Sequence, residues 1–428
     1  MKHIFEKLLA HFALAILKKY HPRIVGITGS VGKSSTKEAV VKVLAERFRV
    51  RGSPKNYNNE LGLPLAVIGT ASGGRSPARW LAVFSRVGTL LFGRTAYPDV
   101  LVLEMGADHP GDIAYLTRIA PPMVGVVTAV APVHTEFFQN LDGVRREKSA
   151  LVASLAHTGF AVLNHDDELV RTMAGHTRAR VITYGFGEGA DLHALEFTLH
   201  YEVGEKPENA GVLFKIAYGG SVVPVRMNGV LGRQHVYAAL AAAAVGHAFG
   251  MNLIDIARGL TQYEPPRGRM SLVAGIKKTM IIDDTYNASP RATHEALHTL
   301  RAVEISESAR RIAVIGDMKE LGAYAAEGHR EVGKLIAELK IDVLITVGEL
   351  ARGIAHGARG AGMSDDHIFE FMDRAEAGKF LQDRMGEGDV ILVKGSQSAR
   401  MEKIVKEVMA EPERARELLV RQDKDWMS

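Results

Sequence analysis

The chain has 428 residues, 46% hydrophobic and 24% charged, which is enough for two or three separate cores. A formal net charge of +4 is too small to predict a nucleic-acid partner. The absence of cysteine excludes disulfides and thiolate metal sites, and it is compatible with a cytoplasmic protein.

The first 22 residues predict an amphipathic helix. Apolar residues recur there at helical spacing, at Ile4, Phe5, Leu8, Leu9, Phe12, Ile16 and Tyr20. Glu6 and Lys7 interrupt the core that a signal peptide would need, and no apolar run in the chain reaches the roughly 20 residues of a membrane span. We expect this helix to dock on the first domain; contact of residues 1–20 with a membrane surface is the alternative.

Residues 24–36 form the most informative segment. An apolar strand leads into a glycine turn, and then into Lys33, Ser34 and a helix. Such a turn directs backbone amides inward, so a polyphosphate fits it, with Lys33 on the outer phosphates and the Ser34 hydroxyl on Mg²⁺. Ile27 stands where the general phosphate-loop pattern has its first glycine. The predicted phosphate contacts are Gly29, Ser30, Val31, Gly32, Lys33, Ser34 and Ser35.

Strands and helices alternate from residue 23 to about residue 161. Continuous apolar runs at 100–103 and 124–128 predict a parallel sheet covered on both faces. Glu104 follows the first of these strands and His134 lies shortly after the second, so both could hold Mg²⁺ beside the phosphates. The alternatives are a turn or capping carboxylate for Glu104, and an ordinary surface histidine for His134.

A dense group of amides occupies residues 56–64. Asparagine clusters commonly form turns by bonding their own backbone, and that interpretation is favoured here. A substrate-binding role for Asn58 and Asn59 is the second interpretation.

The hydrophobic period changes to two between about residues 193 and 227. A Gly219–Gly220 pair between two such runs predicts a hairpin, and an alanine-rich helix follows from about residue 234. Prolines and glycines at 265–269 indicate an interdomain hinge. Beyond it, strands at 280–283, 312–315, 343–347 and 390–393 predict a Rossmann-like domain.

The predicted fold is therefore α/β. A central P-loop-type parallel-sheet domain (23–266) with an added small antiparallel sheet precedes a C-terminal Rossmann-like domain (267–428). Asp283 ends one predicted strand of the second domain and Asp284 follows it, whereas Lys394 follows the last predicted strand. The acids could bind a cation or a substrate amine, or cap the helix starting near Pro290. Lys394 could serve a substrate or be a solvated lysine.

Taken together and in this order, these motifs resemble the Mur ligase family. The resemblance runs from about residue 23 to residue 408. It rests on the phosphate loop, on 56–64, on 104–113, on 283–290, on 316–322 and on 394–396. Within the family it is greatest to ligases that add D-alanyl-D-alanine to a muramoyl tripeptide in cell-wall synthesis. It implies an ATP- and Mg²⁺-dependent, ADP-forming amide ligase acting on small molecules through an acyl phosphate.

The resemblance also implies roles that the pattern alone does not give. Lys148 matches the lysine that the family carbamylates, although its local sequence is that of a surface lysine. Glu104 and His134 match positions that hold a second Mg²⁺. Asn287 and Arg269 match the region that packs on the nucleotide.

Three departures from the family pattern bear on the substrate. Only 22 residues precede the first strand, so we expect no N-terminal UDP-binding domain; residues 232–238 differ from the family motif; and Ala150 replaces an acid. One alternative is therefore a ligase acting on a lipid-linked or other polymer acceptor without UDP. Another is a non-catalytic nucleotide-binding subunit. The charge is compatible with either a monomer or a dimer.

Overall fold

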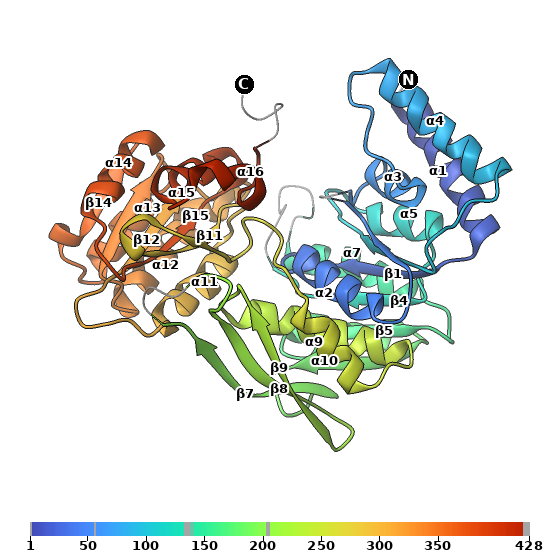
Figure 1. Ribbon diagram of the computed structural model, residues 1–428, viewed down its shortest axis with the longest axis horizontal. Coiled ribbons are helices and arrows are strands. Elements are labelled where there is room, and N and C mark those ends of the chain that lie inside the picture. Colours follow the sequence, from blue (N-terminus) through green and yellow to red (C-terminus); the bar gives the residue numbers. More distant parts are fainter. Residues whose placement is uncertain (1, 55–56, 132–137, 139, 203–205, 423–428) are drawn as a thin grey trace. The chain divides into compact units, whose positions relative to one another are not determined.

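The computed structural model describes residues 2–54, 57–131, 138, 140–202 and 206–422 (Figure 1). Two compact units divide the chain. Unit 1 comprises Met1–Leu195, Lys215–Val225 and Tyr237–Tyr263, and unit 2 comprises Glu196–Phe214, Arg226–Val236 and Glu264–Ser428. The chain passes from unit 1 to unit 2 for the last time between Tyr263 and Glu264, close to the domain boundary expected at residue 266. That domain boundary stays a prediction.

A nine-stranded sheet, in the order β2-β3-β1-β4-β5-β6-β7-β8-β9, organises unit 1. Its strands are β1 (Arg23–Thr28), β2 (Val50–Gly52), β3 (Val100–Glu104), β4 (Val124–Val127), β5 (Phe160–Asn164), β6 (Arg180–Gly185), β7 (Leu192–His200), β8 (Gly211–Tyr218) and β9 (Ser221–Asn228). From β2 through to the β6–β7 pair all pairings are parallel. The predicted antiparallel addition is thus not a separate sheet, because β7–β9 extend the parallel one. The residue ranges of these three strands cross between the two units.

Helices cover this sheet, as its unbroken apolar strands require. They are α1 (Lys2–Tyr20), α2 (Lys33–Ala45), α3 (Gly62–Ile68), α4 (Pro77–Phe92), α5 (Asp112–Ile119), α7 (Leu141–Ala153), α8 (Glu168–Arg171), α9 (Arg233–Ala248) and α10 (Leu253–Thr261). The predicted hairpin is confirmed as β8–β9, where Gly219 and Gly220 both adopt positive φ, the conformation that a tight hairpin turn needs.

Two strand glycines let α7 approach the sheet closely. A Cβ on Gly26 of β1 would lie 3.1 Å from Leu151, and a Cβ on Gly125 of β4 would lie 3.2 Å from the same side chain. Leu151 therefore packs directly on the strands. Lys148 precedes Leu151 by three residues and shares its helix face, so the same packing carries Lys148 against the sheet.

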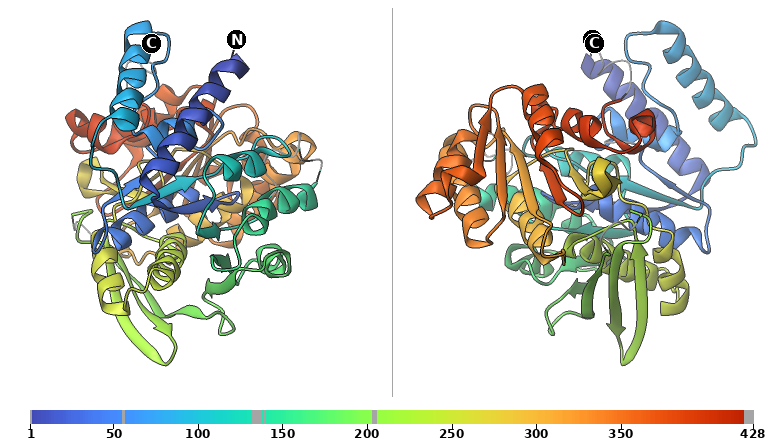
Figure 2. Two further views of the ribbon diagram at one scale, coloured as in Figure 1. Left: turned by 90° about the vertical axis from the view of Figure 1, so that its right-hand side faces the viewer. Right: turned by 60° about the vertical axis from the view of Figure 1, so that its left-hand side comes forward.

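Helix α1 docks on unit 1 through its apolar face, as predicted. Leu9, Ala13 and Ile16 are fully buried in the core that also includes residues of α3 and α4. Figure 2 shows α1 and α4 side by side in both of its views. No helix in the described part of the chain combines the length and the apolar character needed to cross a membrane.

Unit 2 is built on a second sheet, in the order β10-β11-β15-β12-β13-β14. Its strands are β10 (Ser271–Ala274), β11 (Met280–Asp284), β12 (Arg311–Gly316), β13 (Val343–Val347), β14 (Ile368–Phe371) and β15 (Val390–Lys394). All pairings are parallel except that of the edge strand β10 with β11. The main helices are α11 (Pro290–Ala302), α12 (Ala325–Glu338), α13 (Arg352–Gly360), α14 (Arg374–Arg384), α15 (Glu402–Val408) and α16 (Ala415–Leu418).

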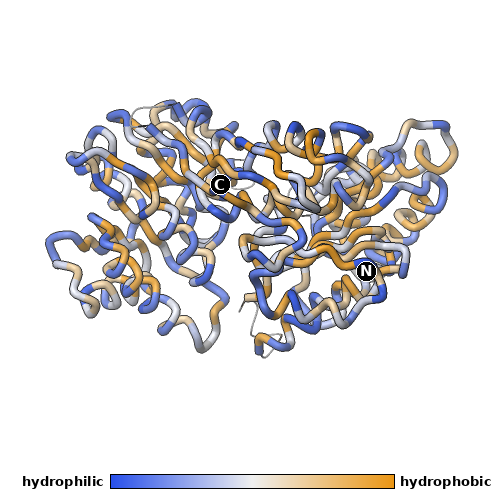
Figure 3. Tube along the Cα trace, turned by 90° about the horizontal axis from the view of Figure 1, so that it is seen from below, coloured by the Kyte–Doolittle hydropathy of each residue, from blue (hydrophilic) through white to orange (hydrophobic). Residues whose placement is uncertain are grey.

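Two hydrophobic clusters lie in unit 2 and bury alternate residues of the same strands. Ile282 and Leu392 belong to one cluster, whereas Ile281 and Ile391 belong to the other. Neighbouring strand residues point to opposite faces, so these helices cover both sides of the sheet. Figure 3 shows hydrophobic segments running through the interior of each unit. The predicted α/β class with two sheets is confirmed.

One lysine joins α1 to the end of α4. The Lys19 ammonium donates to the carbonyls of Leu90, Leu91 and Gly93 at 2.9, 3.0 and 2.7 Å. We expect Lys19→Met to destabilise unit 1 by about 1 kcal/mol, because the last carbonyls of α4 lose a cationic donor. Calorimetric unfolding measures this, with Lys18→Met at the neighbouring exposed position as control. Equal transition temperatures for both variants would contradict it.

Candidate active site

The carboxyl ends of three adjacent strands assemble the site in unit 1. β1 pairs in parallel with β3 and β4, with Ile27 opposite Glu104 and Thr28 opposite Val127. Because parallel strands end at one edge of a sheet, the loop after β1, the carboxylate of Glu104 and the segment after β4 meet there. The strand-end prediction for Glu104 is thereby correct in position.

The phosphate loop is held in shape by the segment after β4. The hydroxyl of Thr128 donates to the carbonyl of Val31 at 2.5 Å, and the amide of Ser30 donates to the carbonyl of Ala129 at 2.8 Å. Gly29 has φ +147°, and a Cβ there would lie 1.9 Å from Thr128 Oγ1. Only glycine fits this position. Sequence reasoning missed Thr128, whose signal was its place at the end of the second predicted strand.

Helix α2 begins at the loop with its N-terminus directed at the site. Its capping residue is Gly32, at φ +85°, which has no side chain to accept from the first amides. Lys33 folds back, and its ammonium donates to the carbonyl of Gly29 at 2.5 Å. A glycine cap, a helix N-terminus and a lysine over the loop are the features that bind a phosphate group.

Glu104 is buried, 1% exposed, and faces the start of α2. Its carboxylate accepts from the Ser34 hydroxyl at 3.2 Å and pairs with the Lys37 ammonium at 3.2 Å. The turn and capping alternatives for Glu104 are not supported, because its observed partners are side chains of α2. Lys37 was not singled out from the sequence, although it lies one turn after Lys33 on the same helix.

Lys148 of α7 is 4% exposed, so it is not the surface lysine that its local pattern suggests. Burial lowers the pKa of Lys148 to about 7, and the nearby cation of Lys33 acts in the same direction. Glu147 and Asp108 oppose this effect. The carboxylate of Glu147 is itself bound to two amides, those of Gly111 and Ile113, both at 2.7 Å. Lys148 is therefore a buried amine close to Lys33 that titrates near neutrality.

The amide-rich segment lies next to the β3 end of this site. The Asn59 side chain accepts from the amide of Gly62 at 2.9 Å at the start of α3, which agrees with the turn-forming interpretation. The carbonyl of Asn58 accepts from the amide of Gly106 at 2.8 Å. A Cβ on Gly106 would lie 2.9 Å from the Asn58 amide group, so this side chain packs against the residues after Glu104.

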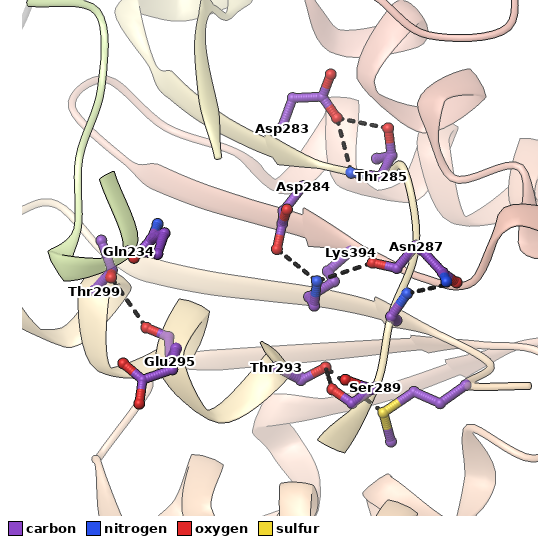
Figure 4. A network of polar contacts seen from close by, with 12 residues as sticks. Gln234, Asp283, Asp284, Thr285, Asn287, Ser289, Thr293, Glu295, Thr299 and Lys394 are labelled. Atoms are coloured by element: carbon purple, nitrogen blue, oxygen red, sulfur yellow. Dashed lines mark hydrogen bonds and ion pairs between the residues drawn. The ribbon is translucent and has the colours of Figure 1, made fainter. Parts of the chain in front are cut away.

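In unit 2 a buried lysine brings together residues predicted separately (Figure 4). Lys394, 2% exposed, pairs with Asp284 at 2.5 Å and donates to the carbonyl of Asn287 at 3.0 Å. It is not a solvated lysine. The helix-capping alternative for the two acids is also not supported, because Ser289 holds the N-cap position of α11 and the carboxylate partners are elsewhere.

Asp283 is fully buried beside this cluster. One carboxylate oxygen accepts from the hydroxyl of Thr285 at 2.6 Å and from its amide at 3.1 Å. Among the described residues the other oxygen has no hydrogen-bond partner. Burial raises the pKa of Asp283 to about 7. The raised pKa and the oxygen without a partner indicate that the carboxyl group of Asp283 is protonated, and so neutral, in the folded protein below about pH 7.

The side chains of Arg269 and Asn287, also predicted for the site, make contacts other than those described above. The Arg269 guanidinium lies over the ring of Tyr286, 4.0 Å from its centroid, and the Asn287 side chain accepts from the amide of Ala288 at 2.9 Å. Both belong to unit 2. His134 lies outside the described residues, as does Asn56 of the amide-rich segment.

Hard oxygen donors face the phosphate loop, and they fit Mg²⁺. The Ser34 hydroxyl and the Glu104 carboxylate lie within hydrogen-bond distance of each other, and Mg²⁺ commonly takes one or two protein oxygens and completes its shell with phosphate and water. Within the described residues, no group of three or more His, Asp or Glu side chains forms a metal centre. The donor set therefore suits a cation held jointly with a phosphate.

A glycine phosphate cradle at the end of a parallel strand, with a lysine over it and a buried carboxylate beside it, defines a nucleotide-dependent α/β enzyme. The Mur ligase middle domain matches residues 87–246, and the Mur ligase glutamate ligase domain matches residues 268–397. The chain belongs to the Mur ligase family. Members of this family are ATP-dependent, ADP-forming ligases, so the alternative of a non-catalytic subunit is set aside.

Similar proteins extend over almost the whole chain. A UDP-N-acetylmuramoyl-tripeptide–D-alanyl-D-alanine ligase of Mycobacterium tuberculosis is 33% identical over 405 residues, covering 91% of this chain and 73% of the relative. The ligase of the same name from Bacillus subtilis is 28% identical, covering 94% and 79%. A MurF ligase from Thermotoga maritima, solved in complex with ADP, is 27% identical with a TM-score of 0.76, covering 94% and 83%.

Gly29→Ala tests the phosphate loop. Because a Cβ would overlap the Thr128 hydroxyl in a backbone conformation that alanine avoids, we expect a loss of stability of at least about 2 kcal/mol and a loss of ATP-analogue binding. Urea unfolding and titration calorimetry measure the two effects. Gly88→Ala in α4, where a Cβ meets nothing within 4 Å, is the control and should not weaken binding. Unchanged binding by Gly29→Ala would contradict this account of the loop.

Asp283→Asn tests the buried acid of unit 2. Between pH 3.8 and about 7 the folded state holds a proton on Asp283 that the unfolded state has lost, so stability falls as pH rises through this window. Asparagine keeps the acceptor for Thr285 and carries no charge, so the variant should lose this part of the slope and be more stable at pH 8.

Calorimetric unfolding at several pH values measures the slope. Asp366→Asn, which removes an exposed carboxylate from the same unit, is the control and should behave like the original chain. Parallel stability curves for Asp283→Asn and the original chain would refute the assignment.

Proposed function

We propose that this protein is an ATP-dependent amide ligase of cell-wall precursor synthesis that joins D-alanyl-D-alanine to a muramoyl-tripeptide-type acceptor. The observation that carries the proposal is the 33% identity, across nine-tenths of the chain, to a ligase with that named activity. A MurF ligase with a similar fold binds ADP, which supports ATP as the energy source here.

The phosphate loop is proposed to bind the triphosphate. Gly29, Ser30, Val31, Gly32, Lys33, Ser34 and Ser35 would provide amides and side chains for this. Ser34 and Glu104 would hold Mg²⁺, which neutralises charge on the transferred phosphoryl group when bound, and His134 is proposed as a further ligand. Lys33 would stabilise the charge that develops on the γ-phosphate.

Lys148 is proposed to carry a carbamate. A neutral amine attacks the carbon of CO₂, a new N–C bond forms, and one amine proton is released, so the side chain becomes an anion. Only the neutral amine is nucleophilic, and burial lowers the pKa of Lys148 to about 7, so a large fraction is neutral at physiological pH. An anion beside Lys33 would relieve the repulsion between two neighbouring cations.

The proposed reaction has two steps. An oxygen of the acceptor carboxylate attacks the γ-phosphorus and the bond to ADP breaks, giving an acyl phosphate. The amine of the dipeptide then attacks the acyl carbon, the bond to phosphate breaks, and the amine loses a proton.

Residues outside the phosphate loop would serve the ligands. We propose that Asn287 and Arg269 contact the nucleotide. Asp284 and Lys394, predicted as substrate residues, are instead proposed as positioning residues, because they neutralise each other and Lys394 donates to the carbonyl of Asn287. A substrate role remains proposed for Asn58. For Asn59 it is less well supported, because its side chain caps α3.

Release of ADP with ATP, Mg²⁺ and D-alanyl-D-alanine tests the function. We expect turnover that depends on both the dipeptide and an acceptor with a free carboxylate. A UDP-linked muramoyl tripeptide and its UDP-free and lipid-linked counterparts should be compared. Turnover with the UDP-linked acceptor supports the proposal, whereas turnover restricted to a UDP-free acceptor replaces the acceptor assignment. ADP release that no acceptor stimulates would refute the function.

Lys148→Ala tests the carbamate. We expect activity to fall by about 100-fold or more, since a charged group acting in the transition state is lost, and to recover partly with formate or acetate, which can occupy the vacated space. Arg146→Ala, which changes an exposed residue of the same helix, should keep activity.

Removal of CO₂ and bicarbonate should lower the activity of the original chain but not that of the rescued variant. Activity of the original chain should rise as pH increases through about 7, as Lys148 loses its proton. Full activity of Lys148→Ala without added carboxylate would contradict the carbamate.

A further inference from the structure

Helices α1 and α4 form a side-by-side pair at one end of unit 1 (Figures 1 and 2). The pair is joined by aromatic side chains: Phe5 meets Trp80 edge-to-face at 4.6 Å between ring centroids, and Phe12 meets Phe84 at 6.2 Å. At the C-terminal ends of the two helices, the Lys19 ammonium donates hydrogen bonds to carbonyls at the end of α4. These contacts fix one face of α4 against the protein and turn the opposite face outward.

The outward face of α4 carries two large apolar side chains and no charged one. Leu81 is 71% exposed and Phe92 is 90% exposed, and they lie on one side of the helix together with the small residues Ala78, Ala82 and Ser85, which are also exposed. A solvent-facing helix surface usually carries charged side chains along its middle, but this one carries none. Folding does not require these apolar residues, since Val83, Val87 and Leu90 supply the buried face.

The charge around this face has a single sign. No acidic residue occurs from 61 to 98, whereas this stretch contains Arg75, Arg79, Arg86 and Arg94. None of these arginines has an acidic partner among the described residues. On α1, Lys7 and Lys18 are exposed, and the one acid of that helix, Glu6, is buried. The pair therefore presents exposed leucine and phenylalanine side chains bordered by cations.

Membrane contact of residues 1–20 was the alternative to docking in the sequence analysis, and the structure shows α1 docked on unit 1. Leu9, Ala13 and Ile16 of α1 are buried in the core, so most of its apolar stripe is already used. Leu8, 42% exposed, is the one large apolar residue among positions 5–20 that is prominently exposed.

We propose that the outward face of α4, with the adjoining basic residues of α1, binds the surface of an anionic lipid bilayer. Leucine and phenylalanine side chains would enter the boundary between headgroups and acyl chains, and the arginines and lysines would remain among the anionic headgroups. A second copy of the chain is disfavoured as occupant, because the arginines and lysines that border two such faces would repel each other. This inference is independent of the proposed reaction.

Vesicle sedimentation tests the proposal on the full chain. We expect co-sedimentation with vesicles of phosphatidylcholine mixed with phosphatidylglycerol, little with phosphatidylcholine alone, and release by salt. Leu81→Glu combined with Phe92→Glu should weaken binding by about tenfold or more, because charges would replace the inserted side chains. Arg75→Gln combined with Arg79→Gln and Arg94→Gln should weaken binding to anionic vesicles and reduce its salt dependence.

The matched control is Val222→Glu combined with Ile254→Glu. These residues of unit 1 are 51% and 67% exposed and lie on β9 and α10, so the control adds the same charges elsewhere. It should bind vesicles like the original chain, and thermal unfolding establishes that all variants are folded. Failure of the original chain to bind anionic vesicles, or equal binding by the α4 and control variants, would overturn the proposal. Self-association that only the α4 variant abolishes, without vesicle binding, would replace the bilayer by a second copy.

Discussion

The packing of Leu151 on Gly26 and Gly125 is the contact on which the site of unit 1 depends. A Cβ at either glycine would lie 3.1–3.2 Å from Leu151, which is tighter than an ordinary contact, so Leu151, on the same face of α7 as Lys148, would have to shift. Close packing removes water from the Lys148 amine and places it near Lys33. The low pKa of Lys148 follows from this burial and from the nearby Lys33 cation, so the chemistry proposed for it depends on how α7 packs as well as on the local sequence.

Lys394 and Lys148, two of the buried lysines, have opposite electrostatic environments. Burying an ammonium is costly unless it loses its proton or gains a partner. Lys394 has the carboxylate of Asp284 at 2.5 Å and the carbonyl of Asn287, and this arrangement fixes the segment after β11. Lys148 lies near a cation, and the adjacent carboxylate of Glu147 is engaged by two backbone amides. The first environment stabilises a charge, whereas the second favours a neutral and reactive amine.

Features formed by residues that are contiguous in the chain could be predicted from the sequence, whereas contacts between distant segments could not. The phosphate loop depends on a strand, glycines and a helix start that are contiguous, so residues 29–35 were identified directly. Glu104 and Lys394 were identified because polar residues at strand ends collect at one sheet edge. The pairing of Lys394 with Asp284 could not be foreseen, because it requires β15, the last strand, to lie beside β11. The four-residue strands β10 and β14 were missed, whereas the equally short β4 was found, because β10 and β14 lack the continuous buried apolar run that β4 has.

The stability of helix α4 does not account for all of its sequence. Its buried face, its N-cap at Ser76 and its C-terminal contacts with Lys19 account for why the helix forms and where it lies. None of these requires Leu81 or Phe92, whose side chains contribute little burial, and polar residues there would satisfy folding equally well. The phosphate loop and Lys148 do not require them either, because neither touches α4 in any contact described above. The proposed bilayer contact would give Leu81 and Phe92 a role that folding does not supply.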